Sequence, residues 1–215
     1  MTLCFVHKTI SGHKPGRRVP RCSVTIDAMS EGPNDSVASL AERAYRELRR
    51  AIVRGEFEPG ARLRVEDLTR RFAISSSPVR EALNRLSEQG LVRLLENRGF
   101  RVAPLTAEGV SDLARVRQLV ECEALRDSMA HGDDAWEAQA VAAGHALALA
   151  ERRLGAAARA LDDDWSQRHR AFHMSLYAAC SSPMLRDLAD VFFDNAERYR
   201  RWAARHRPGT RRKHD

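Results

Sequence analysis

Residues 75–86 read SSSPVREALNRL, three serines and a proline that run directly into an amphipathic helix pattern. Serine is a common N-cap and proline fits the first helical turn, so the stretch predicts a helix over residues 77–89. Its apolar positions recur at three- and four-residue spacing and predict one buried face: Val79, Ala82, Leu83 and Leu86. The first turn carries only small hydroxyls and an outward arginine, which indicates a helix end facing a negatively charged partner.

The flanking sequence extends this pattern in both directions. A helical apolar pattern starts at residue 39, EPG (58–60) forms a turn, and VEDLTRRFA (65–73) predicts a short helix. Gly90 ends the third helix, and two short apolar runs, LVRLL (91–95) and FRVAPL (100–105), flank a turn at 96–99. Three helices and a hairpin in this order predict a winged helix-turn-helix domain over residues 37–106.

The remaining sequence predicts a mainly α fold, in which this domain precedes an all-α antiparallel helical bundle over residues 107–215. Four helices are expected, at 107–130, 133–154, 162–180 and 183–206, and no strand signal follows residue 105. Residues 1–36 are basic, rich in proline, glycine and serine, and are expected to be a disordered tail. Met29 offers an alternative start, so residues 1–28 are expected to come from an over-long gene start.

The net charge of +7 is unevenly distributed along the chain. Residues 37–106 carry 14 arginines against 9 acidic residues, whereas residues 107–197 carry 9 basic against 16 acidic residues. This asymmetry favours a polyanion-binding module joined to a module with another task, although two solvated charged faces would give the same count.

Several classes of protein are disfavoured by what the sequence lacks. It has no apolar run of about 18 residues and no secretory signal pattern, so no membrane partner is expected. Its four cysteines are scattered, which fits a reducing cytoplasm. No GxSxG, HExxH, P-loop or GxGxxG motif occurs, so we expect no enzyme; a metal-dependent enzyme built on histidines is the remaining catalytic alternative.

The helix-turn-helix prediction assigns candidate DNA contacts. The N-terminus of the second helix of such a motif enters the major groove, which points to Ser75, Ser76, Ser77 and Arg80. Plain helix capping by the serines, and an intrahelical pairing of Arg80 with Glu81 or Asn84, are the alternatives. Further contacts are expected at phosphates and at the wing tip: Arg43, Arg46, Arg70 and Arg71, then Asn97 and Arg98.

Residues 44–106 resemble the DNA-binding domain of the GntR family of bacterial transcription regulators. The resemblance covers PG (59–60), SPVREAL (77–83), GLV (90–92) and GFRV (99–102). It implies that Ser75, Ser76, Ser77 and Arg80 contact a double-stranded DNA operator. The family commonly has arginine where this sequence has Ser76, so the operator sequence is not predicted.

The second half resembles the FCD effector domain of the FadR subfamily. The similar segments are VRQLVECEAL (116–125), HRAFHMSLYAACSSP (169–183) and ERYRR (197–201). The resemblance implies a small organic acid effector, often beside a metal such as zinc or nickel held by Asp-x-x-x-His and two later histidines. His173 matches that histidine, whereas His169 stands at the aspartate position.

Two readings of the histidines stay open: His169 and His173 share a divalent metal, or they are polar residues satisfied between helices. Arg117 is expected either to bind the effector carboxylate or to form a surface pair with Glu121. Arg198 is also grouped with the effector site, although a basic run commonly forms a solvated face.

Together the resemblances imply a regulator, expected to be a homodimeric repressor, whose operator affinity responds to a small carboxylate. The alternative is a DNA-binding protein whose helical domain only dimerises. The family's bundle contains further helices beyond the segment matched here, so the 107–215 domain is expected to be truncated at its C-terminus.

Overall fold

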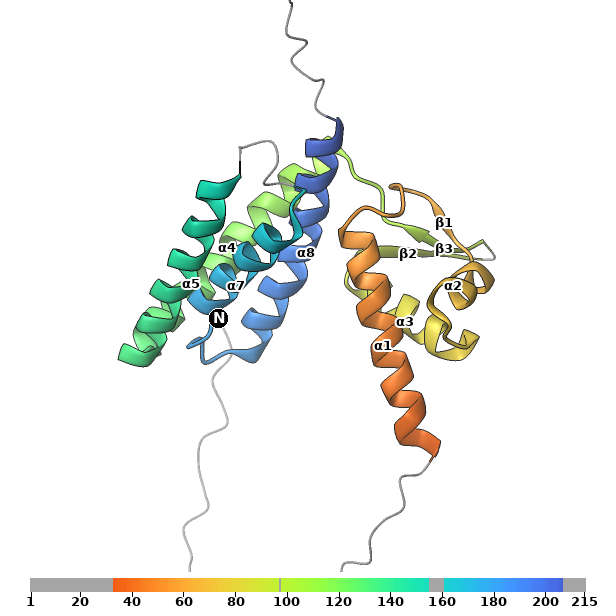
Figure 1. Ribbon diagram of the computed structural model, residues 1–215, viewed down its shortest axis with the longest axis horizontal. Coiled ribbons are helices and arrows are strands. Elements are labelled where there is room, and N and C mark those ends of the chain that lie inside the picture. Colours follow the sequence, from red (N-terminus) through yellow and green to blue (C-terminus); the bar gives the residue numbers. More distant parts are fainter. Residues whose placement is uncertain (1–32, 97, 155–160, 207–215) are drawn as a thin grey trace, which may run out of the picture. The chain divides into compact units, whose positions relative to one another are not determined.

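The computed structural model describes residues 33–96, 98–154 and 161–206, with side chains from residue 39 onward. The first half follows the order α1 (Pro33–Val53), β1 (Arg62–Leu63), α2 (Val65–Phe72), α3 (Ser76–Glu88), β2 (Val92–Leu95) and β3 (Gly99–Val102) (Figure 1). This is the winged helix-turn-helix that the sequence predicts, with α2 and α3 as the paired helices and β2–β3 as the wing.

The turn between α2 and α3 places α3 against α1. Ala73 ends α2 in the left-handed region at φ 52°, and Ser75 then begins α3 in an extended conformation. The apolar side of α3 packs on α1, and the fully buried side chains at the centre of this core are Leu48, Ile52, Val79, Leu83 and Leu86. Their burial fixes which side of α3 remains exposed.

The wing is part of a three-stranded antiparallel sheet in the order β1-β3-β2. The sequence predicts only the hairpin, and β1 is an addition that the structure reveals. Leu63 pairs with Phe100, and both side chains are buried on the core side of the sheet. A two-residue strand carries no periodicity of its own, so only its pairing with β3 defines it.

The second half is helical: α4 (Ala107–His131), α5 (Asp134–Arg153), α7 (Asp163–Leu176) and α8 (Pro183–His206) (Figure 1). Side chains cap all four of these helices, because Thr106, Asp133, Asp162 and Ser182 each accept a hydrogen bond from a first-turn N–H. Helix α4 packs on α8, and α5 packs on α7. None of the described helices is long and apolar enough to cross a membrane.

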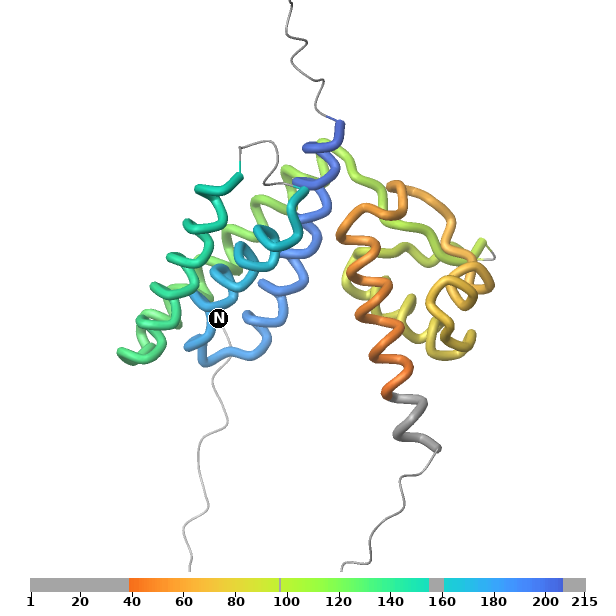
Figure 2. Tube along the Cα trace, in the orientation of Figure 1, coloured from red at the N-terminus to blue at the C-terminus, as the bar shows by residue number. Residues whose placement is uncertain are grey.

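Two helix boundaries differ from the sequence prediction. Helix α1 begins at Pro33, within the expected tail, because proline at a first helical position needs no N–H partner. Helix α7 ends at Leu176 rather than residue 180, and a short turn through Cys180 leads into α8 (Figure 2). The expectations for residues 1–32 and for Asn97 lie outside the described residues.

Candidate functional sites

The N-terminus of α3 presents free polar groups to solvent. Ser75, Ser76 and Ser77 are all exposed, and Ser75 at the N-cap makes no side-chain capping hydrogen bond. The hydroxyls, together with the N–H groups of the first turn, are therefore available to an external acceptor. Because Ser75 makes no capping hydrogen bond, the structure does not show the capping alternative. A helix N-terminus with free hydroxyl and N–H groups binds phosphate readily.

Arg80 lies one turn further along α3 and is exposed. Within the described ranges it forms no ion pair or hydrogen bond, so the alternative pairing with Glu81 or Asn84 is absent. An unpaired guanidinium beside a helix N-terminus can make the two parallel hydrogen bonds that a guanine edge accepts.

The other predicted contacts divide into free and paired arginines. Arg98 is exposed in the turn between β2 and β3. Arg70 pairs with Asp67 at 2.5 Å, and Arg43 lies 3.5 Å from the Phe72 carbonyl oxygen. Arg71 pairs with Glu56, and Arg46 lies on the side of α1 that borders α7 and α8.

The sheet carries a row of arginines that the sequence analysis missed. Arg62 of β1 and Arg93 of β2 both lie directly opposite Arg101 of β3, and all three side chains are exposed. Alternation within VRLL and GFRV could have indicated it, but the contribution of Arg62 depends on the pairing of β1. The row extends the basic surface of the winged helix onto the wing.

A second polar site lies inside the helical domain, where α7 stacks three rings one helical turn apart. The rings of Trp165 and His169 are stacked with centroids 4.5 Å apart, and His169 meets His173 edge-on at 4.7 Å. Phe193 of α8 lies 5.3 Å from His169 and 5.4 Å from His173. The i, i+4, i+8 spacing places all three α7 side chains on the face turned to α8.

Both histidines are half-buried, and each has one buried ring nitrogen without a hydrogen-bond partner. The Nδ1 atoms of His169 and His173 are inaccessible and have no hydrogen-bond partner within the described residues. Burial, followed by the charges of His173 and Arg200, lowers the pKa of His169 to about 4, and burial also lowers the pKa of His173. Both rings are therefore neutral at pH 7, and the Nδ1 atom of each remains without a hydrogen-bond partner among the described residues.

Two guanidinium groups border this histidine cluster. Arg117 of α4 pairs with Glu121 at 2.6 Å, and its charge contributes to the low pKa of both histidines. Arg200 of α8 lies over the Trp165 ring at 4.4 Å. Arg117 thus forms the pair with Glu121, which is one of the two sequence alternatives, and its role toward an effector stays a prediction.

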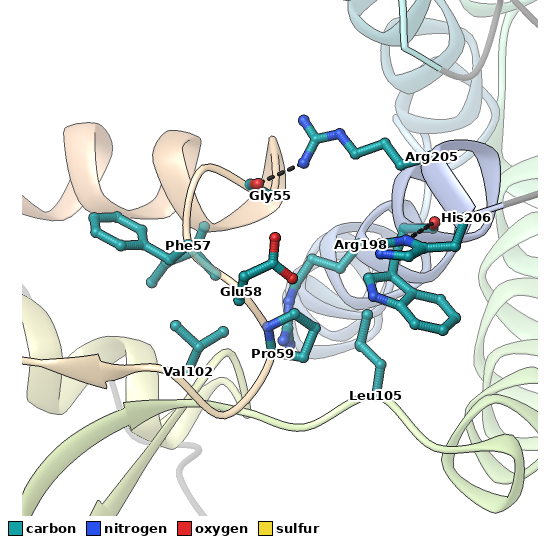
Figure 3. Close-up of a pocket in the computed structure, with 11 residues that line it drawn as sticks. Gly55, Phe57, Glu58, Pro59, Val102, Leu105, Arg198, Arg205 and His206 are labelled. Atoms are coloured by element: carbon teal, nitrogen blue, oxygen red, sulfur yellow. Dashed lines mark hydrogen bonds between the residues drawn. The ribbon is translucent and has the colours of Figure 1, made fainter.

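Arg198 does not join the histidine cluster, which corrects its grouping with the effector site. Its guanidinium donates to the Ala103 carbonyl oxygen at 2.5 Å, and burial lowers its pKa to about 10. Figure 3 shows Arg198 beside Pro59 and Leu105 in a cavity of about 20 Å³, and Arg205 donating to Gly55. This small cavity accommodates a water molecule, whereas a second, more open cavity of about 480 Å³ is lined by Arg198 together with Ala103, Asn195 and Tyr199.

The described donors do not complete a metal site. Zinc in proteins takes four ligands, or three and a water, and no group of three histidine, cysteine or acidic side chains converges in the described part of the chain. The three aspartates before α7 have other partners. Asp162 caps the helix, Asp163 pairs with Arg201 at 2.7 Å, and Asp164 pairs with Arg168 at 2.9 Å.

A winged helix-turn-helix with a free serine–arginine helix end, joined to a helical domain with a buried polar cluster, defines a two-domain DNA-binding regulator. The model of bacterial regulatory proteins of the gntR family matches residues 40–102, and the FCD domain model matches residues 112–215. The chain belongs to the GntR family and carries an FCD domain. It is a DNA-binding transcriptional regulator and no enzyme.

Similar proteins support this assignment over most of the chain. The uncharacterized HTH-type transcriptional regulator BphR of Paraburkholderia xenovorans (strain LB400) is 39% identical over 85% of this chain and 75% of its own length. The HTH-type transcriptional repressor GlaR of Escherichia coli (strain K12) is 36% identical over 73% of this chain and 70% of its own.

Solved structures show the same arrangement. A GntR transcriptional regulator from Rhodococcus sp. RHA1 aligns with TM-score 0.56 and 32% identity over 74% of this chain and 73% of its own. E. coli McbR/YncC aligns with TM-score 0.64 over 78% of this chain and 76% of its own, and at 20% identity it supports the fold alone.

Proposed function

We propose that this protein is a repressor whose operator affinity changes when a small organic acid binds at the histidine cluster. The relative named as a repressor, GlaR, supports the direction of regulation. The proposed ligand contacts are His169, His173, Arg117 and, in place of Arg198, Arg200. The proposed operator contacts are the three serines at the start of α3, Arg80, Arg98 and the arginine row of the sheet.

The pair of buried, unpartnered Nδ1 atoms carries the effector proposal. A buried nitrogen without a partner costs about 1–3 kcal/mol, and a bound ligand would remove that cost. A neutral imidazole can donate one N–H to a carboxylate, and Arg117 and Arg200 supply positive charge beside it. We assign these nitrogens to the ligand rather than to a metal, since the described donors number two.

The effector and the operator would communicate through the relative placement of the two winged helices in a homodimer. An effector that binds one placement better than the other shifts the equilibrium by its difference in affinity for the two. A two-fold dimer would match a palindromic operator with one recognition helix in each half-site.

Fluorescence anisotropy of the full chain on a duplex from its own upstream region tests the operator contacts, with a scrambled duplex as competitor. Loss of one bidentate base contact costs about 1–3 kcal/mol, so Arg80→Ala should bind the native duplex about 5- to 150-fold more weakly. Arg115→Ala, an exposed arginine on α4, is the control and should bind like the wild type. Equal binding of both duplexes by the wild type would contradict sequence-specific recognition of the operator.

Thermal shift measurements with a panel of dicarboxylates and sugar acids test the effector site. At least one compound should raise the melting temperature of the wild type and weaken operator binding, and His173→Phe should abolish both effects. If no acid alters stability or operator binding, the helical domain serves only to dimerise, as in the alternative raised by the sequence.

A further inference from the structure

A groove of about 330 Å³ lies where α1 of the winged helix borders α7 and α8 of the helical domain. From Pro33 onward the described residues belong to one compact unit, in which α1 packs on α8. Neither His169 nor His173 lines the groove, although Phe193 lies between the groove and their rings.

Arginines outnumber carboxylates two to one in the groove lining. Six arginines reach it, and the acidic residues that reach it are Asp163, Asp194 and Glu197. Four of the arginines are paired. Arg49 and Arg170 both bind Asp190 and Asp194, and Arg54 and Arg201 both bind Asp163.

Arg46 and Arg50, both on α1, are the unpaired members. The guanidinium group of neither residue forms a hydrogen bond or an ion pair with any residue that the structure describes, and both side chains are exposed. They lie one turn apart on the face that borders α7, where Arg170 and Gln167 complete the lining. The polar rim is therefore positively charged and incompletely neutralised, while Val53 and Phe193 provide an apolar floor.

We propose that this groove binds a small multivalent oxyanion, a molecule with two or more carboxylate or phosphate groups. Arginine binds either group with two parallel hydrogen bonds, and about 330 Å³ is at the small end of the size range of ligand sites. One anionic group would bind Arg46 and Arg50 of α1, and a second would bind Arg170 and Gln167 of α7.

Occupancy of the groove would strengthen the contact between the DNA-binding and helical domains. In the described structure α1 packs on α8, and the ion pair between Arg54 and Asp163 at 2.6 Å connects α1 to α7. Arg46 and Arg50 of α1 line the groove without a carboxylate partner, whereas Arg170 of α7 is held by Asp190 and Asp194. A bound oxyanion would neutralise Arg46 and Arg50 of α1 and connect them to α7, so it would act as a second ligand at a site other than the histidine cluster.

Isothermal titration of the full chain with citrate, and separately with pyrophosphate, at constant ionic strength tests the site. The Arg46→Gln/Arg50→Gln variant should bind the preferred anion at least tenfold more weakly than the wild type. Arg115→Gln/Arg126→Gln removes the same charge from two exposed positions on α4 and should bind like the wild type. Preference for citrate or for pyrophosphate then identifies the anionic group.

Three outcomes would overturn the proposal: neither anion binds the wild type, the groove variant binds as well as the wild type, or both double variants lose affinity equally. The last result would mean that net charge alone attracts the anion. The titrations are repeated in the His173→Phe background, which removes the proposed effector site: there too the groove variant should bind the preferred anion at least tenfold more weakly than its parent, so failure of the groove and failure of the effector site are distinguishable. Arg50→Lys keeps the positive charge but lacks the planar guanidinium that makes two parallel hydrogen bonds. It should bind with intermediate affinity and serves as a milder second variant.

Discussion

At the scale of single residues, His169 shows how one substitution changes the chemistry of a site. The FCD resemblance places an aspartate here, and an imidazole instead stacks on Trp165 and meets His173. An aspartate at this position would carry a charge that a metal could neutralise. The imidazole is kept neutral by burial, and it contributes a hydrogen-bonding nitrogen instead.

The low pKa of His169 predicts a pH-dependent stability. The unfolded chain takes up the proton near pH 6.5, whereas the folded chain takes it up at about pH 4. Because the unfolded chain binds this proton first, the free energy of unfolding is highest above pH 6.5 and decreases progressively as the pH falls toward 4. His169→Phe should flatten the free energy of unfolding across this interval, as measured by urea denaturation at several pH values.

His145→Gln, a histidine replacement at an exposed position of α5, provides the matched control for the pH experiment. Parallel curves for His169→Phe and the wild type between pH 6.5 and 4.5 would show that His169 titrates normally in the folded protein.

At the scale of elements, the three-stranded sheet combines a buried apolar face with an exposed cationic one. Leu63, Phe100, Val92 and Val102 are buried, while the arginine row of Arg62, Arg101 and Arg93 is on the opposite face. Like charges directly opposite one another destabilise a sheet, so this row is a cost to the isolated protein. A DNA phosphate would offset that cost.

Arg93→Thr separates the cross-strand repulsion from the proposed phosphate contact, because the Arg93 side chain has no partner among the described residues. Removing one repulsive cross-strand pair should stabilise the protein by about 0.2–1 kcal/mol. Operator affinity should fall, and the slope of log K against log salt should become shallower by about 0.9, the value for one lost phosphate contact. An unchanged salt slope would place the arginine row outside the DNA interface.

The sequence predicts the helices and the hairpin well because each is defined by local periodicity and turn residues. Gly90, for example, has φ +73° immediately after α3, as a helix-terminating glycine does. The misplacement of Arg198 has a geometric cause: residues two apart on a helix point about 200° away from each other. The sequence alone could not show that Arg200 lies over the Trp165 ring of the cluster while Arg198 donates to the Ala103 carbonyl oxygen.

At the scale of the whole molecule, α8 holds the two halves of the chain together. It contacts the histidine cluster through Phe193 and Arg200. Its residues also bind the winged helix: Asn195 donates to the Gln89 carbonyl oxygen at 3.0 Å, and Asp190 pairs with Arg49 at 3.1 Å. A displacement of α8 by a ligand on one side would therefore act directly on α1 and the end of α3 on the other.

Asp194 is the centre of this connection and gives the clearest test of it. Its carboxylate accepts from Arg49 of α1 and from Arg170 of α7, and its side chain is 8% exposed. Removing one partner from a buried ion pair costs about 3–5 kcal/mol, because the other charges remain buried. Asp190 still neutralises part of that charge, so Asp194→Asn should destabilise the protein by about 3 kcal/mol, the low end of that range.

The same variant should also uncouple the halves of the chain. Differential scanning calorimetry should show one unfolding transition for the wild type and two for Asp194→Asn, since the winged helix and the helical domain have separate hydrophobic cores. Asp187→Asn, at an exposed position on the same helix, should keep the single transition. If Arg49→Gln and Asp194→Asn had strictly additive effects on stability, the contact between α1 and α8 would not persist in solution, and α8 could not relay ligand binding to the winged helix.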